Sequence, residues 1–393
     1  MKWLRNLLDK VAPTFEKGGK LEKFYPIFEA TDTILFSTDE RTHSGPHIRD
    51  SIDVKRVMIL VVVSLIPCYI FGAMNVGYQM ALALGQTTTW QENLLNGAVT
   101  ILPIIAVTFA SGGFWELLFA VVRKHPVNEG FLVTCALIPL VMPPTIPLWQ
   151  VAVATSFGIV IGKEIFGGVG MNIFNPALVA RAFLFFTYPA RISGDKVWIS
   201  GPDGHSGATA LAVPAAEINQ DAVTLLHSVS QFDFSWMNMF MGWIPGSIGE
   251  TSTLWILIGA IFLAVTGIAS WRVMVGALLG LIGMAALTNF MAEWTGSMNT
   301  MLTLPAHYHL VMGGFAFGIA FMATEPVTGA HTDKGRWVYG IFIGALTVII
   351  RSINPAYPEG AMLAILLMNA FAPLIDYYVI RGNIKRRLVR YAQ

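Results

Sequence analysis

The chain has 393 residues, of which 54% are hydrophobic and only 12% are charged, with a formal net charge of +1 at pH 7 and a mean hydropathy of +0.60. These values exclude an ordinary soluble globular protein and give no electrostatic sign of nucleic-acid binding, so we predict an integral membrane protein. The two cysteines, Cys68 and Cys135, lie inside apolar runs, so we expect no disulfide framework, iron–sulfur cluster or other protein-held metal.

Residues 1–55 form a predominantly polar N-terminal extension. Apolar residues recur there at helical spacing, opposite Lys2, Arg5 and Lys10. They are Trp3, Leu4, Leu7, Leu8 and Val11. This pattern predicts an amphipathic helix at a membrane surface, or a helix that docks on a partner. The first long apolar run begins only after about fifty residues, which is unlike a signal peptide.

Apolar runs that are long enough to cross a bilayer then follow along most of the chain. Seven lie near residues 56–76, 98–122, 149–168, 253–271, 273–291, 337–352 and 360–380, and three weaker ones lie near 128–143, 173–189 and 308–325. We therefore predict an all-α membrane protein with about ten transmembrane helices, in two five-helix repeats over 56–189 and 253–380.

Basic residues are distributed unequally between the two sides that ten crossings define. The side of both termini receives 21 of the 25 Lys and Arg residues, including the basic tail 381–393. By the positive-inside rule, both termini are cytoplasmic and the polar loop 190–252 lies outside the cell membrane.

A weak internal repeat supports the two halves. Asn175-Pro176-Ala177 opens a crossing in the first half, and Asn354-Pro355-Ala356 occupies the matching place in the second. Interrupted segments at corresponding places point to a binding site at the repeat interface near mid-membrane. This feature is equally compatible with a channel or a carrier.

Acidic residues inside the predicted spans are the next candidates for function, because charge in the hydrocarbon region is costly. They are Glu116, Glu164, Glu325 and Asp376, with Glu250 at the start of the sixth crossing. Each could handle a cation or form a structural pair, for example Glu164 with Lys163 or Arg181. Gly112-Gly113 interrupts the second span and suits either close helix packing or the approach of a planar ligand.

The polar loop contains the string Asp203-Gly204-His205-Ser206-Gly207-Ala208-Thr209. A threonine that follows two residues with almost no side chain is accessible to another enzyme, which favours a modified residue. The alternative is a turn in which Ser206 and Thr209 bond to their own backbone. No base adjoins Thr209 to make it a nucleophile, so we assign no catalytic residue.

These strings together resemble NqrB, a membrane subunit of the sodium-translocating NADH:quinone reductase, with RnfD of the related Rnf complex as a sister. The resemblance covers the whole length and includes Gly162 to Gly168, Asn175-Pro176-Ala177, Asp203 to Thr209, and Gly246 to Glu250. The long basic N-terminal extension favours the reductase.

The resemblance implies that Thr209 carries FMN through a phosphoester, installed by an extracytoplasmic flavin transferase. Cofactor contacts are then expected at Asp203, Ser206, Gly207, Ala208 and Asn175. It also implies a non-covalent riboflavin, ubiquinone or menaquinone as substrate near Gly112 and Gly113, and a sodium path through Glu116, Glu250, Glu325 and Asp376.

As partners, the resemblance implies the A, C, D, E and F components of the reductase complex, in a bacterial inner membrane. Three alternatives remain open: an RnfD-type component of a ferredoxin:NAD oxidoreductase, a channel or carrier of the same fold without flavin, and an assembly scaffold that carries flavin but has no quinone or ion site.

Overall fold

The structure is a computed structural model of the chain. It describes residues 2–15, 18–25, 28–29, 32, 36, 45, 54–124, 127, 130–201, 207–217, 220–297, 299–354 and 359–391. These residues form helices and their connections, with no β-strand within the described ranges. The all-α prediction is therefore confirmed for this part of the chain.

Six helical segments are long and apolar enough to cross a membrane. They are α3 (Val54–Ala83), α4 (Trp90–Arg123), the segment Leu148–Phe166 that contains α6 (Leu148–Val160) and η2 (Glu164–Phe166), α13 (Trp271–Thr295), α16 (Asp333–Ile353) and α17 (Ala361–Tyr391). Three shorter apolar helices are α5 (Gly130–Leu140), α7 (Pro176–Thr187) and α12 (Thr253–Val265). The multi-pass character is thus confirmed, whereas the count of ten crossings stays a prediction.

The predicted crossing near 308–325 is broken into short pieces. It consists of α14 (Ala306–Val311), α15 (Phe315–Phe317) and η4 (Gly318–Met322), a single π-helical turn. Gly313, with φ of 66°, separates the first two pieces, because a left-handed backbone conformation ends a right-handed helix. Interrupted helices of this kind leave backbone groups free for a ligand inside a membrane protein.

Local sequence signals set the ends of several helices. Thr89 and Glu92 form a reciprocal capping box at the start of α4. Asn175 caps α7, since its Oδ1 accepts from the backbone N–H groups of Ala177 and Leu178 at 3.0 and 3.2 Å. Asn354 follows α16, but Pro355 and Ala356 of the matching string lie outside the described residues.

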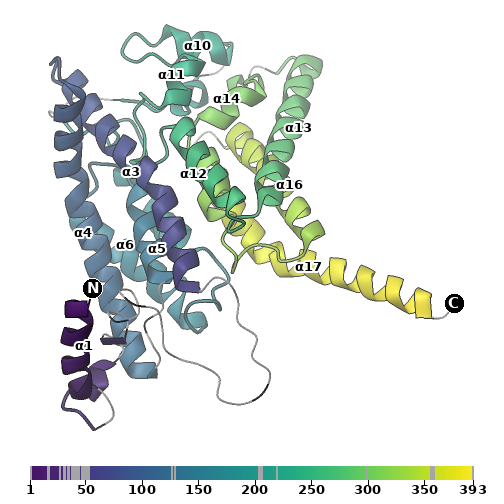
Figure 1. Cartoon of the computed structure of the whole chain (residues 1–393). Helices are drawn as coiled ribbons and strands as arrows, with labels where there is room; N and C mark the ends of the chain where they lie inside the picture. The colour runs from purple at the N-terminus through teal and green to yellow at the C-terminus, as the bar shows by residue number, and fades with distance from the viewer. Residues whose placement is uncertain are drawn as a thin grey trace.

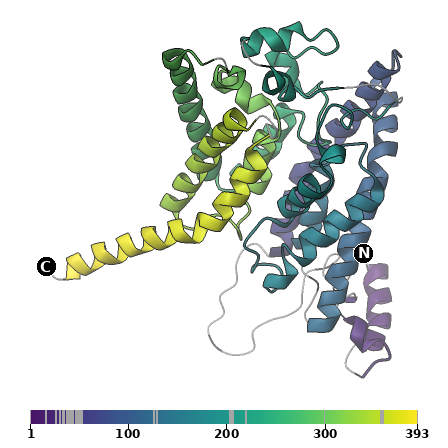
Figure 2. The ribbon, with the colours of Figure 1, turned by 180° about the vertical axis from the view of Figure 1, so that it is seen from behind.

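The long helices gather in two groups, one of α3 to α7 and one of α12 to α17 (Figures 1 and 2). In the first group, α4 packs against α3 and α6, and α6 against α7; in the second, α16 packs against α13 and α17. The α13–α16 contact is very close, because a Cβ on Gly280 would lie 2.0 Å from the Ile341 carbonyl oxygen. Small residues that let two backbones meet are the usual device for helix association in lipid.

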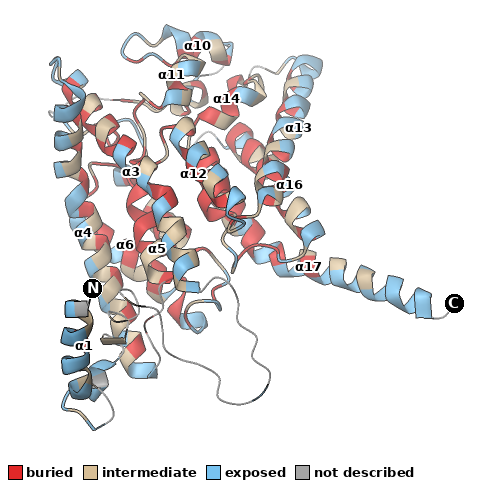
Figure 3. Cartoon of the chain, viewed as in Figure 1, coloured by how far each residue is buried: buried red, intermediate tan, exposed pale blue. Residues whose placement is uncertain are grey.

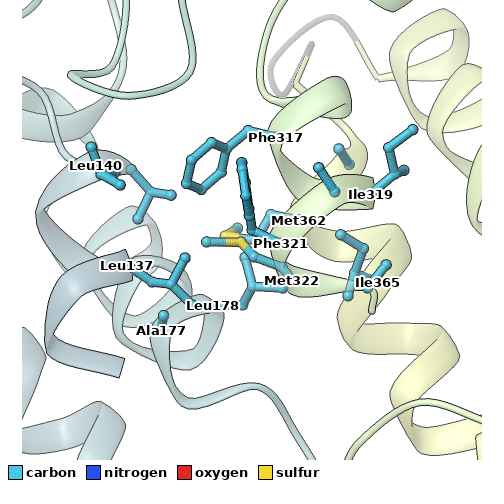
Figure 4. Packing of buried hydrophobic residues seen from close by; sticks show 14 of the residues in the cluster. Leu137, Leu140, Ala177, Leu178, Phe317, Ile319, Phe321, Met322, Met362 and Ile365 are labelled. Carbon is cyan, nitrogen blue, oxygen red and sulfur yellow. The ribbon is translucent and has the colours of Figure 1, made fainter. Parts of the chain in front are cut away.

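A continuous apolar core joins the two groups. Figure 4 shows Leu137, Leu140 and Leu178 of the first group facing Phe317, Phe321 and Met322 of the second. In contrast, the outward faces of several helices are exposed (Figure 3). The exposed side chains include large apolar ones, such as Val99 and Leu102 on α4. An apolar outside is the mark of a surface that lipid covers.

The two ends of the bundle carry different elements (Figure 1). α1 (Lys2–Phe15) and the C-terminal end of α17 lie at one end, while α10 (Ala222–Ser228) and α11 (Trp236–Met241) lie at the other. The loop elements pack on their own small core, which includes Leu226, Phe234 and Tyr308. Both termini therefore lie opposite the polar loop, although which end faces the cytoplasm stays a prediction.

Candidate functional site

Thr209 lies just before the short helix α9 (Ala212–Ala216), in the part of the polar loop that the structure describes from Gly207 onward. Its side chain is half-buried, and its hydroxyl oxygen accepts a 3.3 Å hydrogen bond from the Ala212 N–H. That bond uses the oxygen only as an acceptor, so the hydroxyl proton is not needed to hold the local fold. Asp203 and Ser206 lie outside the described residues.

A cavity opens beside Thr209; we call it the Thr209 cavity. It encloses about 420 Å³ of empty space, part of it open to solvent. Its lining is Arg181, Phe185, Ile192, Ser193, Gly194, Trp198, Thr209, Ala212 and Glu359. Gly207 and Ala208 do not line it. Gly207 instead packs tightly, because a Cβ there would lie 2.4 Å from Ile199 Cδ1.

Arg181, on α7, lines this cavity and joins distant parts of the chain. Its guanidinium donates to Glu250 Oε2 at 3.0 Å, and also to Glu359 Oε2 and to the Val141 carbonyl oxygen. Glu250 is thus paired with a cation from the other half. Arg181 does not pair with Glu164, which corrects one of the pairings considered from the sequence.

Glu116, on α4, forms a buried ion pair with Lys163, which follows α6. Lys163 Nζ also lies 3.3 Å from Glu164 Oε1, and Arg123 binds the other Glu164 oxygen at 3.0 Å. Two carboxylates therefore balance two cations at the end of α4 that is nearer to α1 (Figure 1). This arrangement gives Glu116 and Glu164 structural partners and holds α4 against the segment after α6.

The adjacent glycines on α4 differ in their surroundings. A Cβ on Gly112 would lie 2.4 Å from Cys135 Sγ, so this glycine is required where α4 packs against α5. The nearest atom to a Cβ on Gly113 would be Phe131 Cε2, at 4.0 Å. Gly112 is buried and Gly113 is only partly buried. A ligand could therefore approach Gly113 but not Gly112.

Glu325 follows the broken segment α15–η4. It lines a second cavity, between the two halves, which we call the central cavity. Its carboxylate accepts hydrogen bonds from Asn172 Nδ2 at 3.2 Å and from Thr328 Oγ1 at 3.0 Å. No lysine, arginine or histidine of the described ranges forms an ion pair with it. Unlike Glu116 and Glu250, its carboxylate is bound by neutral donors among the residues that the structure describes.

The central cavity lies between the two halves and encloses about 780 Å³ of empty space, part of it open to solvent. Apolar residues line most of it, among them Val61 of α3, Leu137 of α5 and Leu263 of α12. The polar residues that line it are Thr134, Lys163, Asn172, Asn175, Thr324 and Glu325. An apolar cleft with a few polar groups at one side is the usual form of a small-molecule site.

Asp376, on α17, does not reach either cavity's lining. Its carboxylate accepts from the backbone N–H groups of His331 and Thr332 at 2.7 and 3.0 Å, and from Thr332 Oγ1 at 2.5 Å. Thr332 is the N-cap of α16, so Asp376 stabilises the start of that helix. The four acidic residues that were predicted for the sodium path thus occupy four separate environments. Within the described ranges, no group of three His, Cys, Asp or Glu residues is arranged to hold a metal.

Sequence reasoning missed two features of these sites. It gave Arg181 no role beyond a possible pair with Glu164, and it did not single out Glu359 or Asn172 at all. The only available signal was that Arg181 is an arginine inside a predicted crossing, where a cation has to find a partner.

These features define an integral membrane protein of apolar helices, with interrupted segments, buried ion pairs and cavities at or between its halves. The chain belongs to the NQR2, RnfD, RnfE family, whose sequence model matches residues 41–385.

Relatives match the chain along nearly their whole length. The chain is 51% identical to the B component of the Na(+)-translocating NADH-quinone reductase of Chromohalobacter salexigens, over 99% of this chain and 97% of the relative. It is 49% identical to the protein of the same name from Yersinia pestis over 98% of this chain and 99% of the relative. The protein of that name from Ectopseudomonas mendocina is 48% identical over the same shares of the two chains.

Proposed function

We propose that this chain is the NqrB component of a sodium-translocating NADH:quinone reductase in a bacterial inner membrane, with FMN esterified to Thr209. The observation that carries the proposal is about 50% identity to proteins of that name over 98–99% of the chain. The match includes the N-terminal extension, which favours the reductase over an RnfD-type component. The A, C, D, E and F components of the complex and a flavin transferase are the partners that follow.

The surroundings of Thr209 suit such a group. The hydroxyl stands at a cavity that offers aromatic side chains, Phe185 and Trp198, and a cation, Arg181. An aromatic ring system can pack on the former, and the guanidinium compensates negative charge. A bound flavin supplies one-electron chemistry, while the protein fixes its place and electrostatic surroundings.

The central cavity is our proposed place for the non-covalent riboflavin. Its apolar walls suit the faces of a planar ring, and Thr134, Asn172 and Asn175 present side-chain donors and acceptors that can pair with the ring's polar edge. Asn175 also caps α7, so the same side chain supports the fold and lines the cavity. The sequence prediction of Asn175 as a cofactor contact fits this cavity rather than the one beside Thr209.

For the quinone we propose the partly exposed face of α4 at Gly113, with Gly112 serving the packing beneath it. For sodium, Glu325 is the strongest candidate, because its carboxylate has oxygen-bearing neighbours and no cation to neutralise it in the described structure. Hard oxygen ligands are what such an ion requires. Glu116, Glu250 and Asp376 remain proposed members of the ion path, although each already has a structural partner.

In-gel flavin fluorescence under denaturing conditions tests the FMN assignment. The wild-type chain and Thr209→Ser, which keeps a hydroxyl, are expected to fluoresce. The fluorescence of Thr209→Ser is expected to be weaker, to the extent that the transferase modifies serine less efficiently than threonine. Thr209→Ala is expected to be dark while the complex still assembles. Fluorescence retained by Thr209→Ala refutes the site. A dark wild-type chain favours the channel or carrier instead.

A further inference from the structure

The Arg181 side chain belongs to two cavities at once. It lines the Thr209 cavity, and it also lines a smaller cavity between the two halves, together with Glu250, Gly314 and Glu359. Glu359 lines both as well. The ion-pair group therefore separates the space beside Thr209 from the interface of the two halves.

This group combines charges of both signs, because Arg181 contacts two carboxylates, and a second guanidinium, that of Arg351, contacts Glu359. One guanidinium contacts two carboxylates, that of Glu250 at 3.0 Å and that of Glu359. The Arg181 side chain is 4% exposed, and the side chains of Glu250 and Glu359 are 11% and 25% exposed. At such low exposure, charges act on their neighbours through a much lower effective dielectric than that of water. Because Arg181 and Glu359 both line the Thr209 cavity, their charges both contribute to the electrostatic potential inside it.

Several contacts fix this cation in place. The Val141 carbonyl oxygen accepts a hydrogen bond from Arg181, and Ser247 Oγ lies 3.4 Å away. On the other side, Arg351 donates from Nε to the Glu359 carbonyl oxygen at 3.1 Å. A guanidinium that binds several acceptors at once cannot be replaced by a lysine without loss of some of these contacts.

We propose that Arg181 is a positioning residue for the flavin on Thr209: its cation favours the electron-rich form of the flavin, and the carboxylates of Glu250 and Glu359 act in the opposite direction. This inference rests on the proposed attachment of FMN to Thr209. A flavin that gains an electron without a proton becomes more negative, so a fixed cation beside it raises its midpoint potential, and neutralising Arg181 lowers it. Removing the carboxylate of Glu250 or Glu359 raises the midpoint potential.

The size of the effect follows from the burial. A change of one charge at a partly buried site is expected to shift the one-electron equilibrium about tenfold, which corresponds to about 59 mV. Arg181→Gln is expected to lower the midpoint potential by that amount, and Glu359→Gln to raise it. Arg181→Lys keeps the charge and is expected to shift it less than Arg181→Gln.

The test is an optical redox titration of the full chain, purified in detergent after coexpression with a flavin transferase, with mediators and a chemical reductant that supplies the electrons. The titration of Thr209→Ala is subtracted to remove any non-covalent flavin. Arg191→Gln is the matched control, because Arg191 is exposed next to the cavity residue Ile192, and water screens its charge. It is expected to shift the potential least.

Opposite shifts for Arg181→Gln and Glu359→Gln, both larger than for Arg191→Gln, support the inference. If the Arg181→Gln variant protein does not accumulate in the membrane, the inference is judged from the shift in midpoint potential of Glu359→Gln alone. Potentials that match the control, in chains whose in-gel fluorescence shows covalent flavin, overturn the role of Arg181 and leave the proposed function standing. Absent fluorescence in the wild-type chain overturns the proposed function itself.

Discussion

Lys163 and Glu116 form an ion pair between α4 and the segment after α6, with both side chains 2% exposed. Removing one partner of a buried pair leaves an uncompensated charge, which typically costs about 3–5 kcal/mol. We therefore predict that Lys163→Met lowers the thermal stability of the chain strongly. The double variant Glu116→Gln with Lys163→Met is predicted to regain much of the loss, and thermal denaturation of the purified variants measures both.

A double variant as unstable as Lys163→Met alone contradicts the pairing. Glu116→Ala is also predicted to raise the sodium concentration needed for half-maximal quinone reduction. Because Glu116 supports the fold, the sodium dependence is measured on variant complex that has been shown to assemble. An unchanged sodium dependence in that complex removes Glu116 from the ion path.

Glu325 offers a cleaner test of sodium handling, since no ion pair depends on it in the described structure. Glu325→Gln keeps the side-chain size and one acceptor oxygen but removes the charge. We predict a several-fold increase in the sodium concentration for half-maximal turnover, with a smaller loss of thermal stability than for Lys163→Met. Steady-state quinone reduction against sodium concentration measures the shift, and an unaltered curve excludes the assignment.

The two adjacent glycines of α4 are predicted to separate packing from ligand binding. Gly112→Ala places a methyl group 2.4 Å from Cys135 Sγ, and overpacking of this kind costs about 1–3 kcal/mol. Gly113→Ala meets its nearest atom at 4.0 Å and is expected to leave stability unchanged. Quinone titrations should show a raised KM for Gly113→Ala. Equal stability losses in both variants would refute the difference in packing, and an unchanged KM would refute the quinone site.

Asn172 tests the central cavity. Its amide donates to Glu325 and lines the cavity, but it caps no helix, unlike Asn175. We predict that Asn172→Leu, which keeps the volume and removes the polar group, lowers the non-covalent flavin released on denaturation while the covalent flavin is unaffected. Thr324→Val, at the same cavity, is expected to lower the released flavin less than Asn172→Leu does. Full retention of released flavin in both variants contradicts riboflavin binding there.

The helices were predictable because a long apolar run can hide its backbone in lipid only as a helix. All six long segments coincide with predicted crossings. The run near 308–325 is broken instead, at Gly313 and at the π-turn η4, and short apolar runs do not reveal such breaks. Cap residues such as Asn175 were visible in the sequence as an Asn-Pro pair at the start of α7.

The sites were only partly predictable. Thr209 is singled out as a candidate by its own local string. The cavity beside it also depends on Arg181 and Glu359, which are 178 positions apart in the chain. The role of Asp376 likewise depends on the backbone of His331 and Thr332, 44 or 45 positions earlier. Periodicity and composition carry no information about such distant pairs, so these partners emerge only from the fold.

Mass spectrometry of the peptide Val197–Arg272, which trypsin releases by cutting after Lys196 and Arg272, tests the central claim most directly. We predict that this peptide, from the mature wild-type complex, carries the mass of FMN joined through phosphate, with fragment ions that place it on Thr209. An unmodified peptide from mature complex, or fragment ions that place the flavin on another residue, would contradict the account.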